Sequence, residues 1–324
     1  MTRVLDVHEL RISFTAPDGH RFHPVDGVSF GLDRGETLAL VGESGSGKSL
    51  TSLALLRLVP PPGRIDPGSS IRLGDTDVMA LEGEALRRIR GRRIGMIFQD
   101  PMTSLNPVFT VGDQIVEGIR AHLPMSKADA RERARGLLQE VGIPDPGDRL
   151  GAYPHQLSGG MRQRVMIAIA LSAEPEILVA DEPTTALDVT VQAQILEVLD
   201  QLRRSRGMAI LLITHDLGIV AGRADRVAVM YAGQIVEEAS TAELFARPSH
   251  PYTQGLFASV PRISGPIQRL TPIGGTVPPA TAWPAGCRFR PRCPQAFEKS
   301  EREPELLPVG PGHRMRCWLA EEPR

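Results

Sequence analysis

Short apolar runs alternate along this chain with longer stretches in which apolar residues recur at helical spacing. The runs Val4–Phe14 and Val25–Leu32, joined by a Pro-Asp-Gly turn, predict a pair of antiparallel strands. Thr37–Val41 is a third, short apolar strand, and it leads through a glycine-rich loop into a helical pattern at Ser49–Leu58. Three consecutive prolines at 60–62 predict the end of that helix.

The middle of the chain combines apolar strands with a long helical segment. The pattern is helical from Val111 to about Leu171. Strands are predicted at Arg93–Phe98, Ile177–Ala180, Met208–Ile213 and Val227–Tyr231, with another helix at Val191–Arg204. Because strands that alternate with helices are typical of parallel sheets, we predict a mostly parallel α/β core with a helical insertion at about residues 100–173.

The composition of the chain changes after Pro248. Residues 248–324 contain 14 of the 28 prolines and all three cysteines. Proline-rich sequence with few periodic runs predicts irregular structure. We therefore expect two domains, a large one at 1–247 and a loop-rich extension at 248–324.

Charge and hydropathy exclude some classes of function. A formal net charge of −1 and a pI near 6.7 give no sign of a nucleic-acid or anionic-lipid surface. The N-terminus lacks the pattern of a secretory signal, and the longest apolar runs are far shorter than the ~18 residues that span a bilayer. We expect a cytosolic protein that reaches a membrane only through a partner.

Residues 42–49 fit the pattern G-x-x-x-x-G-K-[ST] of a phosphate-binding loop, also called Walker A. The predicted nucleotide-binding residues here are Gly42, Glu43, Ser44, Gly45, Ser46, Gly47, Lys48 and Ser49. Glycines let the backbone wrap around phosphate oxygens, and the following helix adds the positive end of its dipole. Lys48 supplies a charge to the β- and γ-phosphates, while the Ser49 hydroxyl is expected to coordinate Mg²⁺.

A second anion-binding pattern follows at Leu157–Gln163, which reads Leu-Ser-Gly-Gly-Met-Arg-Gln. A serine and two glycines that open a helix favour an anion. This segment resembles the signature of ABC-type ATPases. The resemblance implies a P-loop NTPase (RecA-like) core with an N-terminal antiparallel β subdomain. It also implies that Ser158, Gly159, Gly160 and Gln163 bind the γ-phosphate side of an ATP held by a second subunit.

Two carboxylates follow the apolar strand Ile177–Ala180, at the end of a parallel strand where ligands bind. Because neighbouring residues on a strand face opposite ways, Asp181 and Glu182 can have different functions. We expect Asp181 to bind Mg²⁺. The resemblance implies that Glu182 is the general base that acts on the attacking water.

The resemblance carries over four further residues. Gln99 matches the glutamine that senses Mg²⁺ and the attacking water, and His215 matches the switch histidine that contacts the γ-phosphate. Asp188 lies in a segment similar to the D-loop of the family. Phe14 is the candidate for the aromatic residue that stacks on adenine, although Phe22 lies across the same hairpin and an aromatic in a strand is usually part of the core.

The C-terminal extension indicates which group of ABC-type ATPases the chain resembles. His250-Pro251-Tyr252-Thr253 and the segment Cys287–Pro294 are similar to the extension of the oligopeptide, dipeptide and nickel importer ATPases. This implies a peripheral subunit at the cytoplasmic face of a bacterial membrane. It further implies a second ATPase subunit, two permease subunits and a solute-binding protein as partners. The implied activity is ATP hydrolysis that energises uptake of oligopeptides or dipeptides, with nickel, glutathione or another small solute as alternatives.

The cysteines leave several alternatives open. In some members of that family the extension holds an iron–sulfur cluster on four cysteines, but Ser300 stands where the third would fall. Cys287, Cys293 and Cys317 could still hold a cluster, or could form a zinc site with His313. Free thiols at a decayed site are the simplest interpretation.

A different class of function is a soluble ABC ATPase that acts on DNA or ribosomes. The long coiled-coil insertion of the DNA-repair kind is not predicted here, and the ribosomal kind usually carries two ATPase units in one chain. A P-loop kinase would have no use for the second anion-binding pattern. The sequence therefore favours the transporter.

Overall fold

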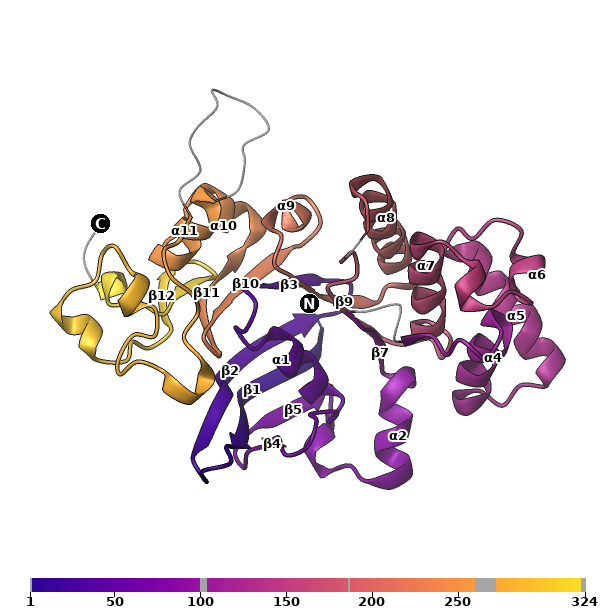
Figure 1. Cartoon of the computed structure of the whole chain (residues 1–324), viewed down its shortest axis with the longest axis horizontal. Coiled ribbons are helices and arrows are strands. Elements are labelled where there is room, and N and C mark those ends of the chain that lie inside the picture. Colours follow the sequence, from indigo (N-terminus) through magenta and orange to yellow (C-terminus); the bar gives the residue numbers. More distant parts are fainter. Residues whose placement is uncertain (1, 100–103, 186, 260–271, 322–324) are drawn as a thin grey trace. The chain divides into compact units, whose positions relative to one another are not determined.

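A computed structural model describes residues 2–99, 104–185, 187–259 and 272–321 (Figure 1). The chain divides into two compact units, each assembled from separate segments. Unit 1 comprises Met1–Leu5, Leu32–Glu36 and Leu73–Leu212. Unit 2 comprises Asp6–Gly31, Thr37–Arg72 and Ile213–Arg324.

An antiparallel sheet fills the N-terminal part of unit 2. Its strands run in the order β2-β1-β5, and β4 also pairs with β1. The bounds are β1 (Arg3–Thr15), β2 (Arg21–Asp33), β4 (Arg64–Ile65) and β5 (Ser70–Leu73). Val7 pairs with Ile71 and Ile12 with Ile65, and all but Ile65 of these four are fully or nearly fully buried. Apolar residues that line one face of the sheet thus set its register, and the predicted hairpin is confirmed.

A second sheet of unit 2 combines parallel and antiparallel pairs, in the order β12-β13-β11-β10-β3. The strands are β3 (Thr37–Val41), β10 (Arg226–Tyr231), β11 (Gln234–Ser240), β12 (Leu307–Gly310) and β13 (His313–Met315). The helices of this unit are α1 (Lys48–Leu55), α9 (Leu217–Val220), α10 (Thr241–Ala246) and α11 (Pro251–Ala258). β3 is buried throughout and pairs in parallel with β10, as its mostly apolar run predicts.

Helix α1 ends three residues before the predicted Leu58. Arg57 adopts a positive φ of 51°, its N–H donates to Ala54 O, and the Leu58 N–H donates to Leu53 O. These bonds close the helix before the prolines are reached.

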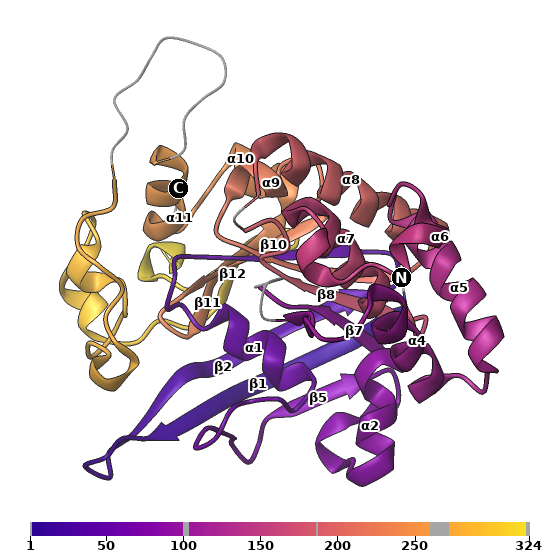
Figure 2. The same ribbon diagram turned by 45° about the vertical axis from the view of Figure 1, so that its right-hand side comes forward.

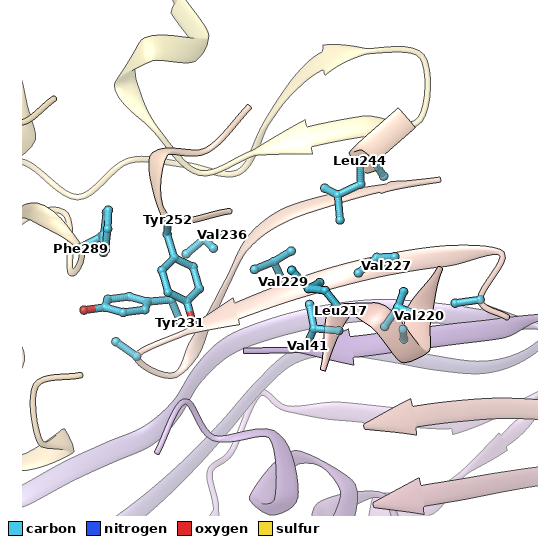
Figure 3. Packing of buried hydrophobic residues seen from close by; sticks show 14 residues of the cluster. Val41, Leu217, Val220, Val227, Val229, Tyr231, Val236, Leu244, Tyr252 and Phe289 are labelled. Carbon is cyan, nitrogen blue, oxygen red and sulfur yellow. The ribbon is translucent and has the colours of Figure 1, made fainter. Parts of the chain in front are cut away.

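Buried apolar side chains of unit 2 form a cluster on β3, β10, β11 and the helices beside them (Figure 3). Val41 and Val229 lie at its centre, and Tyr231, Tyr252 and Phe289 lie at one end. Removing such a side chain from water stabilises the fold by about 1.5–3 kcal/mol. Tyr252 and Phe289 come from the C-terminal segment, residues 248–324. That segment therefore shares a core with β3, the strand that precedes the phosphate loop.

Unit 1 contains the other parallel strands. They are β7 (Ile94–Ile97), β8 (Ile177–Asp181) and β9 (Ala209–Thr214), of which the last continues into unit 2. Ile94 pairs in parallel with Ile177, and the Ala209 N–H donates to Glu176 O. Every residue of β8 and β9 is buried. Helix α8 (Val189–Arg206) connects these two strands in the predicted order, and β6 (Thr76–Asp77) and α2 (Gly83–Arg92) precede β7.

Helices of the described residues form the predicted helical insertion, and Figures 1 and 2 both show them gathered together. They are α4 (Val111–His122), α5 (Lys127–Glu140), α6 (Pro146–Arg149) and α7 (Gly159–Ala170). Thr110 and Ser126 cap α4 and α5 with their hydroxyls, which accept N–H donors from the first turn. Ile115 and Ile119 of α4 and Leu138 of α5 are completely buried where these helices pack.

In its described residues, 248–259 and 272–321, the C-terminal segment has little regular structure beyond α11 and the pair β12–β13. Short 3₁₀ turns occupy Ala280–Ala282, Arg290–Arg292, Glu298–Glu301 and Trp318–Glu321; two others, Val78–Ala80 and Pro154–Gln156, lie in unit 1. Strand β13 pairs with β11, so the end of the chain extends the sheet of unit 2. None of the helices in the described ranges is long and apolar enough to cross a bilayer.

Candidate active site

The phosphate loop lies in unit 2 between β3 and α1 and wraps around its own lysine. Lys48 is 5% exposed, and its Nζ donates to the carbonyl oxygens of Gly42 at 2.8 Å and Glu43 at 3.0 Å. Ser44 and Gly45 at the tip are exposed, whereas Ser46 is completely buried. The loop therefore presents backbone to solvent around a fixed ammonium group, as a phosphate site requires.

The backbone of the loop is held against β10 and the turn after it. A Cβ atom at Gly42 would lie 2.1 Å from the carbonyl oxygen of Met230, so only glycine fits there. The N–H of Gly233 donates to Ser46 O at 2.9 Å. Ser49 lies in the first turn of α1, where its hydroxyl accompanies the positive end of the helix dipole. This set of donors fits a polyphosphate and its metal ion.

A separate cluster in unit 1 surrounds the second of the two carboxylates. Gln99 Nε2 donates to Glu182 Oε2 at 2.9 Å, and Thr185 Oγ1 donates to the same oxygen at 2.9 Å. Asp181, at the end of β8, is 3% exposed, and Glu182 is half-buried. The structure thus brings Gln99 and Glu182 together although they are 83 residues apart.

The backbone at Glu182 is strained. Its φ is 46°, in the left-handed region that a residue with a Cβ rarely adopts. Such a conformation costs about 1–3 kcal/mol and persists where the surroundings impose it, often at functional sites. Here the positive φ comes directly after Asp181, the last residue of β8.

The predicted second anion site opens α7 in unit 1. Ser158 is exposed and caps the helix, since its Oγ accepts the Met161 N–H at 3.3 Å. A Cβ atom at Gly160 would lie 2.6 Å from Cγ1 of Val191 on α8, so this position also requires glycine. The Nε2 of Gln163, a residue that is 2% exposed, has no hydrogen-bond partner within the described parts of the chain. Asp188 caps α8 through the Val191 N–H at 3.0 Å.

Comparison with known proteins identifies the family. A family profile described as ABC transporter matches residues 25–185, and one described as the C-terminal region of oligopeptide/dipeptide transporters matches residues 236–299. The chain is 51% identical over 323 residues to the oligopeptide transport ATP-binding protein AppD of Bacillus subtilis strain 168, with 99% of this chain and 98% of AppD covered. It belongs to the ABC transporter family of ATP-binding proteins.

Two further similarities support this assignment. The dipeptide transport ATP-binding protein DppD of Bacillus subtilis strain 168 is 50% identical over 323 residues, covering 99% of this chain and 96% of DppD. The ATP-binding cassette MJ0796, solved as a dimer in a post-hydrolysis state bound to ADP and Pi, has a TM-score of 0.65 at 26% identity, covering 73% of this chain and 98% of that chain. The predicted fold, that of an ABC-type ATPase, is confirmed.

His215 and Phe14 are the two remaining residues that the sequence predicts to contact the nucleotide. His215 directly follows β9 and is exposed, next to Asp216, which caps α9 through the Gly218 N–H at 2.7 Å. The Phe14 ring stacks on Phe22, with ring centroids 5.9 Å apart, and is half-buried. Gly63 packs against the edge of Phe14, because a Cβ there would lie 2.5 Å from Cζ. The adenine contact of Phe14 and the phosphate contact of His215 stay predictions.

The cysteine hypotheses gain no support from the geometry. Within the described ranges Cys287, Cys293 and Cys317 form no disulfide bond, and no group of three or more His, Cys, Asp or Glu residues is arranged there to hold a metal ion. Ser300 instead accepts the Phe297 N–H in a local turn, at 3.3 Å. The His313 ring bonds Glu237 on β11 at 2.7 Å, so it holds β13 in place.

Three residues at or beside these clusters were missed by sequence reasoning. Thr185 bonds Glu182, and Tyr252 and Arg292 bond Glu43 in the phosphate loop. Thr185 lies three residues after Glu182 and could have been found as a turn partner. Tyr252 and Arg292 are more than 200 residues from the loop, and nothing in the spacing of the sequence connects them to it.

Proposed function

We propose that this chain hydrolyses ATP to drive the import of oligopeptides or dipeptides across a bacterial cytoplasmic membrane. The observation that carries the chemistry is the carboxylate of Glu182, oriented by Gln99 and Thr185 at the end of a buried strand. The similarity to AppD and DppD over nearly the whole chain, together with the C-terminal region of oligopeptide/dipeptide transporters, supports peptides as cargo.

The phosphate loop would bind the triphosphate of ATP. Lys48, already fixed by two carbonyl oxygens, would neutralise charge on the β- and γ-phosphates. Ser49, Asp181 and Gln99 offer hydroxyl, carboxylate and amide oxygens, which are the hard donors that Mg²⁺ prefers, and the ion would neutralise developing phosphate charge. Phe14 would stack on the adenine ring.

Glu182 would accept a proton from the attacking water. Transfer of a phosphoryl group to water depends mainly on positioning and charge stabilisation, so an oriented base beside the γ-phosphate is the chief requirement. The bonds from Gln99 and Thr185 to one carboxylate oxygen fix the direction of the group. His215 would contact the γ-phosphate from the end of β9 and help to position the water.

A second subunit would complete each nucleotide site. Ser158, Gly159, Gly160 and Gln163 would contact the γ-phosphate of an ATP bound to the partner, with Asp188 nearby in the same dimer. The exposed hydroxyl of Ser158 at the start of a 12-residue helix is suited to that contact. The dimer of MJ0796 bound to ADP and Pi is consistent with this arrangement.

Membership of the family supports a proposal for the partners. We propose a second ABC ATPase, either a related chain or a second copy of this one, together with two permease subunits and a solute-binding protein. This chain would be peripheral at the cytoplasmic face and joined to the membrane through the permease. The chain would consist of an ATPase domain at 1–247, with its helical subdomain at about 100–173 facing the permease, and an extension at 248–324.

Replacing the base tests the chemical assignment. Glu182→Gln keeps the shape and the hydrogen bonds but removes the proton acceptor, so kcat for ATP hydrolysis should fall by about 10²–10⁴-fold. The affinity for MgATP, measured by fluorescence of a mant-ATP probe, should change little. Near-normal turnover in this variant would refute the role of Glu182, and loss of nucleotide binding in Lys48→Ala is the matched check that the phosphate loop holds the substrate.

A further inference from the structure

A negative side chain lies within the anion-binding loop. Glu43 is the second residue of the phosphate loop, and its backbone carbonyl bonds the ammonium of Lys48 at 3.0 Å. A carboxylate in this position would repel a triphosphate unless its charge is compensated. Both the carboxylate and the N–H of Glu43 are engaged by residues from the C-terminal segment.

Arg292 compensates the carboxylate of Glu43. Its Nη1 and Nη2 each donate to one carboxylate oxygen, both at 3.1 Å, which is the two-pronged geometry that guanidinium groups favour. The Arg292 side chain is 6% exposed and that of Glu43 is 30% exposed. Arg292 Nε also donates to Gly274 O at 2.8 Å, so the guanidinium is anchored on a second side.

Tyr252 holds the backbone of the same residue. Its hydroxyl oxygen accepts the Glu43 N–H at 2.9 Å. Tyr252 is completely buried at the start of α11, and burial raises the pKa of its hydroxyl, which therefore stays protonated. A buried hydroxyl in a rigid ring is a precise anchor for a loop whose tip is exposed.

A packed aromatic group fixes both contacts. The rings of Tyr231 and Tyr252 lie 4.6 Å apart, and Phe289 meets both, at 5.2 Å and 5.4 Å (Figure 3). The guanidinium of Arg292 lies over the ring of Tyr231, 5.7 Å from its centroid. Tyr231 ends β10, two residues before Gly233, which bonds Ser46 in the loop. The group thus connects the C-terminal segment to the phosphate loop.

We propose that Arg292 and Tyr252 are positioning residues of the phosphate loop: Arg292 neutralises Glu43 and holds its side chain, and Tyr252 fixes its backbone, so that the loop binds ATP. This rests on the proposed role of the loop in nucleotide binding. It gives the C-terminal segment a function within the ATP site of its own chain. Any change that moves the segment 287–294 away from the loop leaves Glu43 uncompensated and weakens nucleotide binding.

A double variant that also removes the charge of Glu43 distinguishes this role of Arg292 from simple support of the fold. In Arg292→Met the carboxylate stays and its partner is lost, so the Kd for mant-ATP with Mg²⁺ should rise about tenfold. In the double variant Arg292→Met with Glu43→Gln no uncompensated charge remains, and the Kd should return to within about threefold of wild type. A defect caused only by lost packing would persist in the double variant and would overturn the proposal.

Two further proteins complete the experiment on the full-length chain. Arg290→Met removes an exposed ion pair with Glu301 from the same 3₁₀ turn and should leave the Kd unchanged. Tyr252→Phe preserves the ring packing but removes the acceptor, and a rise in Kd of about threefold to tenfold is expected. If Arg292→Met does not fold, Tyr252→Phe decides, and an unchanged Kd there contradicts the proposal.

The failure of this inference and that of the proposed site give different results. When wild type binds mant-ATP and Lys48→Ala does not, the loop is the nucleotide site whatever Arg292 does. If Arg292→Met then binds mant-ATP like wild type, the result contradicts the role of the C-terminal segment but leaves the phosphate loop as the nucleotide site.

Discussion

At the scale of single residues, the proposed role of Glu182 depends on how one oxygen of its carboxylate is held. Glu182 Oε2 accepts hydrogen bonds from both Gln99 and Thr185, and the positive φ of Glu182 comes directly after the last residue of β8. Two donors on one oxygen fix the plane of the carboxylate group. If Glu182 is the general base, as proposed, the amide and the hydroxyl would act on catalysis through the direction of its carboxylate.

Removing the amide should affect turnover more than binding. We expect Gln99→Ala to lower kcat by about tenfold to a hundredfold, because the base loses orientation, while KM for MgATP stays within about threefold of wild type. Steady-state ATPase kinetics separate the two quantities.

The matched control is Gln201→Ala on α8. Its amide also donates to a glutamate, Glu197 at 3.3 Å, but on an exposed helix surface. This variant should have wild-type kinetics. Equal losses of kcat in both variants would mean that Gln99 has no special function in positioning Glu182.

Much of the candidate site could be predicted at this scale, because its residues occur in short local patterns. Gly42–Ser49 fits the phosphate-loop pattern by its spacing, whereas Leu157–Gln163 was predicted through its resemblance to the signature of ABC-type ATPases. The pairing of Gln99 with Glu182 follows from the parallel pairing of β7 with β8, whose ends meet at one edge. Arg292 and Tyr252 could not be predicted, since their contact with Glu43 depends on the packing of an irregular segment.

At the scale of elements, α11 begins at an unusual cap. His250 is 1% exposed, and its Nδ1 accepts the Tyr252 N–H at 3.0 Å. Its own N–H and that of Ser249 donate to the buried carboxylate of Glu237 on β11. The start of the helix that carries Tyr252 is thereby tied to the sheet of unit 2.

This cap predicts a pH dependence of stability. Burial lowers the pKa of His250 from its ordinary 6.5 to about 3. Between these values the unfolded chain binds a proton that the folded chain does not, so the contribution is complete above about pH 6.5 and decreases as the pH falls toward 3. The loss amounts to at most about 1.4 kcal/mol per pH unit.

His250→Asn isolates the effect, because asparagine can cap the helix but does not titrate. Urea unfolding at several pH values between 4 and 7 should show a weaker loss of stability on acidification than in wild type. Identical slopes in the two proteins would show that His250 takes up its proton without unfolding. Because the carboxylates titrate alike in both proteins, comparing how steeply their free energies of unfolding change with pH removes the contribution of the carboxylates.

Strands formed by continuous apolar runs were predicted, and short paired strands were missed. β3, β8 and β9 are continuous apolar runs that are buried along their whole length, and the sequence marks them clearly. β12 and β13 have four and three residues; β12 pairs with β13, and β13 pairs with β11, to which the contact between His313 and Glu237 also joins it. Too few residues form these strands for a period of two to be seen.

At the scale of the whole molecule, the chain carries two helix starts suited to phosphate. One, at α1, belongs to unit 2 with the phosphate loop, and the other, at α7, belongs to unit 1 with Ser158. A protein that needs both at one nucleotide can obtain the second from a neighbouring subunit. This is the central claim of the proposed function, and the similarity to a dimeric cassette supports it.

Complementation between two inactive chains tests that claim most directly. Lys48→Ala removes the charge of the phosphate loop, and Ser158→Arg obstructs the start of α7, so each protein alone should have less than about a tenth of the wild-type ATPase rate. Mixed dimers regain one site built from the intact Lys48 of one chain and the intact Ser158 of the other. For random pairing the equimolar mixture should therefore recover about a quarter of the wild-type rate. A mixture no more active than the mean of its two components, while wild type is active, would contradict a shared site.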